Sequence, residues 1–390
     1  MDICHVITRM IIGGAQENTL LSCRGLAARG HHVTLVTGPT RGPEGRLLET
    51  VDTEGFRIVE MGGLVRPLSP WADWTGYREL GRFFRQNSFD VVHTHSSKAG
   101  VLGRVAAWRA EVPLVVHTVH GQSFHPYQAG WRNRLYICLE RLAARHCHHM
   151  FAVAQAMIDQ CVAAGVADRS KYSVVYSGMQ LEPFLKATPD PAFRRHLEIP
   201  DSAPVIGKIA RLFELKGHDV LLHAAPRIVR EFPEVRFLLV GDGLRRAELE
   251  RMAVDLGVRE NVVFAGLVDP EAIPRYVGVM DVLAHFSLRE GLPRTVVQAL
   301  AGGVPAVGFD LDGTPEVIET GRTGILCPAG DERAAEEALL DLLRSPRKRR
   351  ALGAEGRRRV SRRFDWRAMV DKLERAYRDS SRLGDPNTSG

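Results

Sequence analysis

Long hydrophobic runs are missing from this 390-residue sequence. Its apolar stretches, such as residues 113–116, suit strands and fall far short of the ~20 residues that a membrane-spanning helix needs. No basic leader precedes an apolar stretch after Met1, so we expect no signal peptide. These absences predict a soluble, cytoplasmic protein.

Paired cysteines are missing as well. The six cysteines are scattered along the chain without a C-x-x-C pair, at Cys4, Cys23, Cys138, Cys147, Cys161 and Cys327. This spacing predicts reduced, buried thiols rather than a disulfide framework or a zinc site.

The composition is that of a globular protein, with 45% hydrophobic and 25% charged residues. A chain of this length suits two domains of ~150–200 residues. The net charge of +6 favours an anionic partner, and nucleic acid, anionic lipid headgroups and phosphorylated substrates are all compatible with it. Much of the basic excess lies at residues 344–363, where a solvated helical face is the simplest interpretation.

Short β-branched runs alternate with amphipathic stretches along the chain, as in parallel α/β sheets. Predicted strands lie at residues 2–8, 32–37, 57–61, 90–95, 113–120, 150–154, 172–176, 204–210, 236–240, 261–265, 281–285, 305–309 and 324–327. The Pro-rich, charged stretch 182–201 is the best linker candidate. We predict two doubly wound domains, at 1–182 and 183–364, then a helix at 365–382 that can cross back onto the first domain and a disordered tail at 383–390.

A pair of glycines follows the first predicted strand. Gly13 and Gly14 precede a helix, where glycine lets the backbone approach a ligand and the helix N-terminus offers N–H groups to an anion. A simple tight turn is the alternative. The full dinucleotide pattern G-x-G-x-x-G is absent, which argues against an oxidoreductase.

Histidines lie at the ends of two further strands. The segments DVVHTHSSKAG and VHTVHG place His95 and His120 at strand ends, and strand alternation puts His93 and His95 on one face. These side chains could line a site or simply hydrogen-bond to neighbouring loops. A metal centre is disfavoured because no carboxylate or cysteine stands nearby to complete the ligand shell.

Basic residues follow the first strand of the second half. In the segment RLFELKG, Arg211 supplies a fork of donors and Lys216 a point charge, a pair that suits a diphosphate. Two exposed bases on a surface loop are the alternative. One strand later, the GDG at residues 241–243 resembles a nucleotide-binding turn but is common by itself.

The most informative segment is Glu290–Gln298, EGLPRTVVQ. Pro293 suits the first turn of a helix, whose N-terminus would then point toward a ligand phosphate. A core helix explains the apolar residues but leaves Glu290 and Arg294 unexplained. Further along, Asp310-Leu-Asp312 precedes a Gly-Thr-Pro turn, which we interpret as turn chemistry rather than as a metal site.

In this order and spacing, the loops resemble those of the family-four retaining glycosyltransferases. The resemblance spans residues 2–380 and rests on GGAQ, HSSKAG, HTVHG, RLFELKG, GDG, EGLPRTVVQ and GTPE. It implies the α/β GT-B fold, in which two Rossmann-like domains face a central cleft. The first domain would bind the acceptor and the second a nucleotide sugar.

The resemblance also implies roles for matching residues. Arg211 and Lys216 would neutralise the leaving diphosphate, and Glu290 would touch the transferred sugar. Gly14 would approach the donor phosphate through its backbone, while His120 would line the reaction centre. Further donor contacts would come from Gly291, Leu292, Pro293 and Arg294.

One position departs from the family pattern. Where the family has Glu-x7-Glu, with the second acid on the ribose hydroxyls, this sequence has Gln298. An amide can accept one hydrogen bond and donate another but carries no charge, which leaves donor affinity and nucleotide identity open. On the acceptor side, the candidates are Gln16, His95 and Lys98.

The implied reaction is transfer with retention, in which basic side chains stabilise the departing diphosphate without a metal or other cofactor. Similar proteins extend surface polysaccharides on lipid carriers, so we expect a glycan or lipid-linked acceptor and no nucleic-acid partner. The aromatic and basic stretch 122–141 could meet an anionic membrane, or it could be an ordinary packing helix. A nucleotide-sugar epimerase and an inactive nucleotide-sugar-binding protein are the alternative functions.

Overall fold

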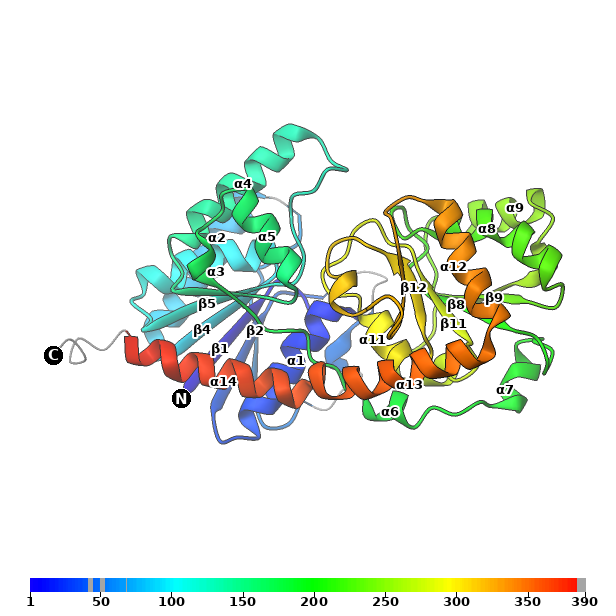
Figure 1. Ribbon diagram of the computed structural model, residues 1–390. Helices are drawn as coiled ribbons and strands as arrows, with labels where there is room; N and C mark the ends of the chain where they lie inside the picture. Colours follow the sequence, from blue (N-terminus) through cyan, green and yellow to red (C-terminus); the bar gives the residue numbers. More distant parts are fainter. Residues whose placement is uncertain (41–44, 50–52, 68, 384–390) are drawn as a thin grey trace. The chain divides into compact units, whose positions relative to one another are not determined.

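Two compact units make up the protein in a computed structural model (Figure 1). The structure describes residues 1–40, 45–49, 53–67 and 69–383. Unit 1 contains residues 1–179 and the C-terminal segment from residue 364, and unit 2 contains residues 180–363. The first domain was predicted to end at residue 182 and the second at residue 364. The first segment of unit 1 ends at residue 179, and unit 2 ends at residue 363. The central cleft between the domains stays a prediction.

Unit 1 is built on a seven-stranded sheet in the order β3-β2-β1-β4-β5-β6-β7. Every neighbouring pair of strands is parallel. The strands are β1 (Asp2–Ile7), β2 (His32–Thr37), β3 (Arg57–Glu60), β4 (Val91–His95), β5 (Leu114–Val119), β6 (His149–Ala152) and β7 (Tyr172–Val174). All seven strands were predicted from the sequence and are confirmed. Most are buried on both faces, as is typical of parallel sheets, whereas β3 at the edge is largely exposed.

The helices of unit 1 cover both faces of this sheet (Figure 1). They are α1 (Gly14–Ala27), α2 (Pro70–Gln86), α3 (Ser97–Arg109), α4 (Gly130–Ala144), α5 (Gln155–Ala163) and α14 (Trp366–Leu383). The C-terminal helix α14 packs on α1 and buries Val370, Leu373 and Tyr377 in the core that also contains Ile3 and Ile7 of β1. Apart from residue 383, the tail predicted to be disordered lies outside the described residues.

Unit 2 repeats the design with a six-stranded sheet in the order β10-β9-β8-β11-β12-β13, again with parallel neighbours. Its strands are β8 (Val205–Ile209), β9 (Arg236–Val240), β10 (Val262–Gly266), β11 (Val282–His285), β12 (Ala306–Phe309) and β13 (Gly324–Cys327). Its helices are α6 (Glu182–Leu185), α7 (Pro191–His196), α8 (His218–Glu231), α9 (Arg246–Asp255), α10 (Ile273–Val277), α11 (Arg294–Ala301), α12 (Glu332–Arg344) and α13 (Pro346–Arg363). Two doubly wound domains are therefore confirmed.

The predicted linker at 182–201 is wrong. This stretch forms the short helices α6 and α7 and belongs to unit 2. Phe184 and Phe193 are buried, and the Asp190 carboxylate accepts the Phe193 N–H to cap α7. The charge and proline content suggested a linker, but two buried aromatic rings and a helix cap anchor the segment to unit 2.

The strand order fixes where ligands can bind. Successive strands run outward in opposite directions from β1 and β4 in unit 1 and from β8 and β11 in unit 2. At such switch points the loops after the two strands diverge and leave a crevice at the carboxyl edge of the sheet. All of the predicted site residues except His120 lie at the ends of these four strands, in the loops after them or in the helices that follow those loops.

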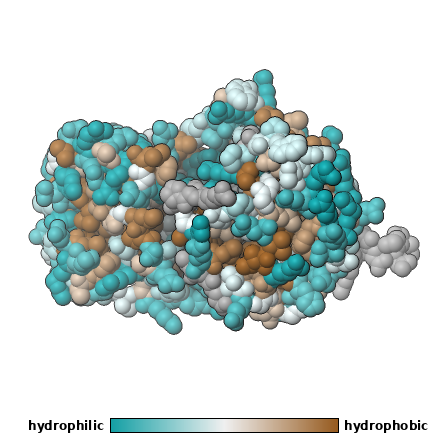
Figure 2. All heavy atoms as spheres, turned by 180° about the vertical axis from the view of Figure 1, so that it is seen from behind, coloured by the Kyte–Doolittle hydropathy of each residue, from teal (hydrophilic) through white to brown (hydrophobic). Residues whose placement is uncertain are grey.

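The surface carries hydrophobic patches separated by hydrophilic side chains on the face in Figure 2. No helix among the described residues is long and apolar enough to cross a membrane. Five of the six cysteines are buried as predicted, whereas Cys138 is exposed on α4. Basic residues of α12 and α13 form ion pairs, for example Arg344 with Glu231 and Arg359 with Glu355, which supports the solvated-face interpretation.

Candidate active site

Three loops of unit 2 are joined by hydrogen bonds at the carboxyl edge of its sheet. The Leu288 N–H donates to the carbonyl of Leu215 (2.8 Å), which links the loop after β11 to the loop after β8. The Glu290 N–H donates to Oδ2 of Asp312 (2.8 Å), in the loop after β12. Asp312 has a φ of +52°, a conformation that favours Asn, Asp and Gly. The aspartate thus has the turn role predicted for it and also anchors Glu290.

An ion pair lies at the centre of these loops. Lys216 Nζ is 2.6 Å from Glu290 Oε1, and both side chains are largely buried. Burial raises the pKa of Glu290, but Lys216 and then His285 lower it, and the result lies below the ordinary value. His285 Nε2 is 3.9 Å from the same oxygen. Glu290 is therefore ionised near neutral pH and can only accept hydrogen bonds.

A buried lysine beneath this pair was not predicted. Lys208 lies on β8 with 1% of its surface exposed, and its Nζ is 5.8 Å from the centre of the Phe286 ring. Burial and the nearby Lys216 lower the pKa of Lys208 to about 7, while Glu290 and Asp219 act against this shift. A lysine within the apolar run Val205–Ile209 was the available sequence signal.

The loop after β8 depends on close packing of backbone. Gly217, the N-cap of α8, has a φ of +65°, and a Cβ there would lie 2.1 Å from the carbonyl oxygen of Phe286. A Cβ on Gly241, the first glycine of GDG, would lie 2.2 Å from the carbonyl oxygen of Ala210. The GDG turn therefore supports the backbone that carries Arg211. Arg211 itself is exposed, with its guanidinium 4.9 Å from the centre of the Phe213 ring.

Helix α11 begins at Arg294, with Pro293 as its N-cap rather than in its first turn. Leu292 and Pro293 are buried, and Gly291 and Arg294 are partly exposed. Gln298 is partly exposed on the second turn, and no hydrogen bond of its side chain to another described residue is found. The structure thus brings Lys216, Glu290 and the start of α11 together.

In unit 1, the glycine pair begins α1. Gly13 is the N-cap in an extended conformation, and Gly14 is the first residue of the helix. A Cβ on Gly13 would lie 2.8 Å from the side-chain oxygen of Gln16, which is flexible enough to yield. The turn therefore does not require a left-handed glycine at position 13. Close approach of a ligand to the helix N-terminus stays the predicted reason for the pair.

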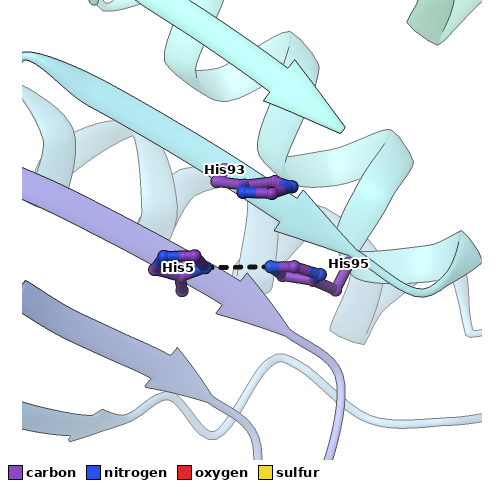
Figure 3. A group of neighbouring side chains, drawn as sticks. All are labelled: His5, His93 and His95. Atoms are coloured by element: carbon purple, nitrogen blue, oxygen red, sulfur yellow. Dashed lines mark hydrogen bonds between the residues drawn. The ribbon is translucent and has the colours of Figure 1, made fainter. Parts of the chain in front are cut away.

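The predicted histidines form a larger cluster than the sequence suggested (Figure 3). His95 is fully buried and hydrogen-bonds through Nε2 to His5 Nδ1 and through Nδ1 to His120 Nε2, both at 2.9 Å. His93 lies over His95, with ring centres 4.2 Å apart. His5, on β1, was missed because its partner is 90 residues away in sequence. Its position in an apolar strand was the only signal.

Two acceptor-side candidates have structural partners. Lys98 Nζ lies 2.5 Å from Asp73 of α2 and also donates to the carbonyl of Pro67. His95, being fully buried, can affect an acceptor only through His120. His120 also lines a cavity of about 40 Å³ in unit 1, which has room for one or two water molecules but not for a sugar.

His5, His93 and His95 are close enough to hold a metal ion. However, His93 already hydrogen-bonds through Nδ1 to the Tyr377 hydroxyl (2.5 Å) and through Nε2 to Thr118 Oγ1 (2.7 Å). Both nitrogens of His95 are also engaged. A metal would have to displace these bonds, so the geometry favours a hydrogen-bonded network.

Each of the two units is matched by a model of a known protein family. The model of the group 1 glycosyl transferases matches residues 189–359, and that of the glycosyl transferase 4-like domain matches residues 13–178. The UDP-Gal:alpha-D-GlcNAc-diphosphoundecaprenol alpha-1,3-galactosyltransferase of Escherichia coli is 26% identical over 383 residues, 97% of each chain. A GDP-mannose-dependent alpha-(1-6)-phosphatidylinositol monomannoside mannosyltransferase of Mycolicibacterium smegmatis is 35% identical over 177 residues, 44% of this chain and 46% of that protein.

The fold is also found among solved structures. Anabaena HepE, in complex with UDP and glucose, superposes with a TM-score of 0.81 at 21% identity, over 96% of this chain and 99% of that one.

The buried amine predicts a pH-dependent stability. The folded-state pKa of Lys208 lies below its unfolded value, so folding is penalised when the amine is charged in the unfolded chain. This loss of folding free energy is small above pH ~10 and largest below pH ~7. We expect Lys208→Met to raise the free energy of unfolding by roughly 2–4 kcal/mol at pH 6 and by under about 1 kcal/mol at pH 10. Urea titrations at both pH values measure this. Lys372→Met, at an exposed lysine of α14, serves as the control, and an equal gain at both pH values for Lys208→Met would contradict the buried charge.

Proposed function

Because the chain belongs to the GT-B glycosyltransferases described by these two family models, we propose that it transfers a sugar from a nucleotide-diphosphate donor to a lipid-linked glycan acceptor with retention of anomeric configuration. The observation that carries the proposal is the Lys216–Glu290 ion pair at the β8–β11 switch point of unit 2. A lysine and an ionised carboxylate, with a helix N-terminus beside them, suit a ligand that has both hydroxyls and phosphates.

In this proposal the leaving diphosphate is stabilised by fixed positive charge. Arg211 and Lys216 follow β8, and α11 directs the N–H groups of its first turn to the same edge of the sheet. These groups would stabilise the charge that develops as the bond from the sugar C1 to the phosphate oxygen breaks. The proposed reaction therefore uses no metal.

Glu290 would orient the sugar rather than attack it. Its carboxylate is held by Lys216 and stays ionised, so it can accept hydrogen bonds from sugar hydroxyls. We propose a front-face route in which the acceptor oxygen bonds to C1 on the side that the phosphate leaves. The acceptor proton passes to an oxygen of the departing phosphate. Gly14 and His120 act on the same donor in this proposal, through a backbone phosphate contact and at the reaction centre.

The acceptor assignment rests on the relatives. The E. coli protein acts on a sugar diphosphoundecaprenol, and the M. smegmatis protein on a phosphatidylinositol mannoside. Both acceptors join a glycan or polyol to a lipid through phosphate, and we propose a role for this chain in surface-polysaccharide synthesis. The two relatives use donors with different bases, UDP-Gal and GDP-mannose. The base of the donor of this chain therefore has to be identified by experiment.

The first experiment pairs UDP-, GDP- and ADP-sugars with lipid-phosphate acceptors. We expect transfer from one donor, with the α-configuration of an α-linked donor kept in the product. Glu290→Gln should lower kcat/KM by ~10- to ~100-fold, since a hydrogen bond to a charged group contributes ~1.5–3 kcal/mol.

The control is Glu250→Gln, which changes a partly exposed, ion-paired carboxylate on α9. An epimerised donor without transfer would support the epimerase, and tight donor binding without any turnover would support the inactive binding protein. Unchanged transfer in Glu290→Gln would refute the site assignment.

The second experiment tests the departure at position 298. A carboxylate accepts stronger hydrogen bonds from ribose hydroxyls than an amide does. We expect Gln298→Glu to tighten binding of the preferred nucleotide diphosphate by about fivefold and Gln298→Ala to weaken it by a similar factor. Isothermal titration calorimetry with UDP and GDP measures both. Identical affinities in all three proteins would show that residue 298 does not reach the nucleotide.

Helix α4 gives unit 1 a surface suited to a membrane. It lies at the outer edge of the unit (Figure 1) and exposes Trp131 (64%) and Leu135 (42%) one turn apart. Arg132 and Arg134 are exposed beside them, and the one acidic residue of the helix, Glu140, is paired with the buried Arg104. Exposed aromatic and aliphatic side chains flanked by arginines favour the surface of an anionic bilayer. We propose that α4 brings the enzyme to its lipid-linked acceptor.

Vesicle sedimentation tests this surface. We expect binding to phosphatidylglycerol-containing vesicles, weaker binding at high salt, and little binding to pure phosphatidylcholine. Trp131→Ala with Leu135→Ala should weaken binding at least ~10-fold, since each buried side chain contributes ~1.5–3 kcal/mol. The control changes two exposed leucines of unit 2, Leu244→Ala with Leu267→Ala. Equal losses in the two double variants would contradict a specific role of α4.

A further inference from the structure

The amine of Lys208 is a buried titratable group that the proposed reaction does not use. Lys208 lies on β8, between β9 and β11 in the sheet of unit 2, and 1% of its surface is exposed. No hydrogen bond or ion pair of this amine to another described residue is found. Its Nζ lies 5.8 Å from the centre of the Phe286 ring. A buried amine without a hydrogen-bonded anion is costly to charge, so its surroundings decide whether it carries a proton.

Charged groups from three neighbouring segments act on Lys208. Burial and then Lys216 lower the pKa of Lys208 to about 7, whereas Glu290 and Asp219 act in the opposite direction. Lys216 follows β8, Glu290 follows β11, and Asp219 lies in the first turn of α8. Because Lys216 and Glu290 are held together at 2.6 Å, their opposite charges partly cancel at Lys208. The amine is therefore divided between its charged and neutral forms near pH 7.

Two buried histidines also face this amine. His218, at the start of α8, and His285, at the end of β11, both interact electrostatically with Lys208. Burial lowers the pKa of His218 to about 2 and that of His285 to about 4. Both rings are therefore neutral above pH 6. Of these three buried bases, Lys208 is the one whose charge changes between pH 6 and pH 8.5.

A nucleotide sugar would change the electrostatics around Lys208. The diphosphate of such a donor is esterified at both ends, so it carries two negative charges and does not titrate between pH 6 and pH 8.5. The charges of Lys216 and Glu290 sum to zero in the free protein, and the bound donor would make this part of the site negative. Two negative charges within ~10 Å favour the charged form of an amine by about a hundredfold at an effective dielectric constant of ~20.

We propose that Lys208 is a positioning residue that takes up a proton from solvent when the nucleotide sugar binds, so that its charge supports the ionised Glu290 while Lys216 is shared with the phosphates. The amine becomes an ammonium group, and no bond of the donor is made or broken in this step. Glu290 then keeps a cation beside it and continues to accept hydrogen bonds from the sugar. This inference rests on the proposed function, since the site must hold a nucleotide diphosphate.

Titration calorimetry in buffers with different enthalpies of ionisation counts the protons taken up per ligand bound. The protein is the full chain, and the probes are UDP-galactose, GDP-mannose and ADP-glucose. We expect uptake of ~0.8 proton per ligand at pH 8 and ~0.1 at pH 6, because the pKa of the free amine is about 7 and the donor favours its charged form. The affinity should fall about tenfold from pH 6 to pH 8.

Two substitutions at position 208 separate the proton from the side chain. Lys208→Met cannot take up a proton, so we expect uptake at pH 8 to fall below ~0.2 proton and binding to weaken ~100-fold at pH 6 and ~10-fold at pH 8. Lys208→Arg stays charged, so we expect it to bind without proton uptake and with the same affinity at both pH values. If Lys208→Arg does not fold, Lys208→Met still tests the proposal. The control is Lys186→Met, at an exposed lysine after α6, which should keep the wild-type uptake.

His285 is the competing source of proton uptake, because its Nε2 lies 3.9 Å from Glu290 Oε1. A histidine whose pKa is about 4 in the free protein would take up more proton at pH 6 than at pH 8, the reverse of the profile expected for Lys208. That reversed profile, or uptake at pH 8 that persists in Lys208→Met, would overturn the proposal.

The proton count is independent of the transfer assay. Donor binding without proton uptake at pH 8 would overturn the role of Lys208 and leave the proposed function standing. Uptake that depends on Lys208, without sugar transfer to any acceptor, would support the role of Lys208 and contradict the proposed transfer. If none of the three nucleotide sugars binds, both proposals fail.

Discussion

The parallel pairing of β8 with β11 and of β1 with β4 is the constraint on which the rest of the structure depends. Parallel strands all end at one edge of a sheet, and the switch in strand order separates the loops that follow the central pair. Lys216 and Glu290, which are 74 residues apart in the chain, therefore meet at one place. The hydrogen bonds from Leu288 to Leu215 and from Glu290 to Asp312 then fix the loops against each other.

The two units place different electrostatics at this edge. In unit 2, Lys208, Lys216 and Glu290 lie together. The ion pair offsets the burial of the Lys216 and Glu290 charges, whereas burial lowers the pKa of Lys208. A charge that is buried and paired has little freedom to reorganise, which suits stabilisation of a leaving diphosphate. In unit 1, the corresponding edge is filled by neutral histidines that hydrogen-bond to one another.

The glycosyltransferase fold could be predicted from the sequence because its signals are local. β-Branched runs of four to eight residues mark the strands, and all thirteen predicted strands are present. The loop segments after these strands, from GGAQ to EGLPRTVVQ, could be found because glycine, proline and charged residues interrupt apolar patterns. The linker at 182–201 was wrong because its composition resembles a linker while Phe184 and Phe193 are buried in unit 2.

The sequence by itself determined the element order, the α/β class and the identity of the site loops, since each depends on the residue types within a short window. Only the tertiary structure decided which side chains meet. Lys208 and His5 stand in apolar strands with no neighbouring motif, and the groups that each of them contacts or interacts with lie on other strands or loops. Burial and long-range pairing set their charge states, and neither quantity can be read from the residues on either side of them in the chain.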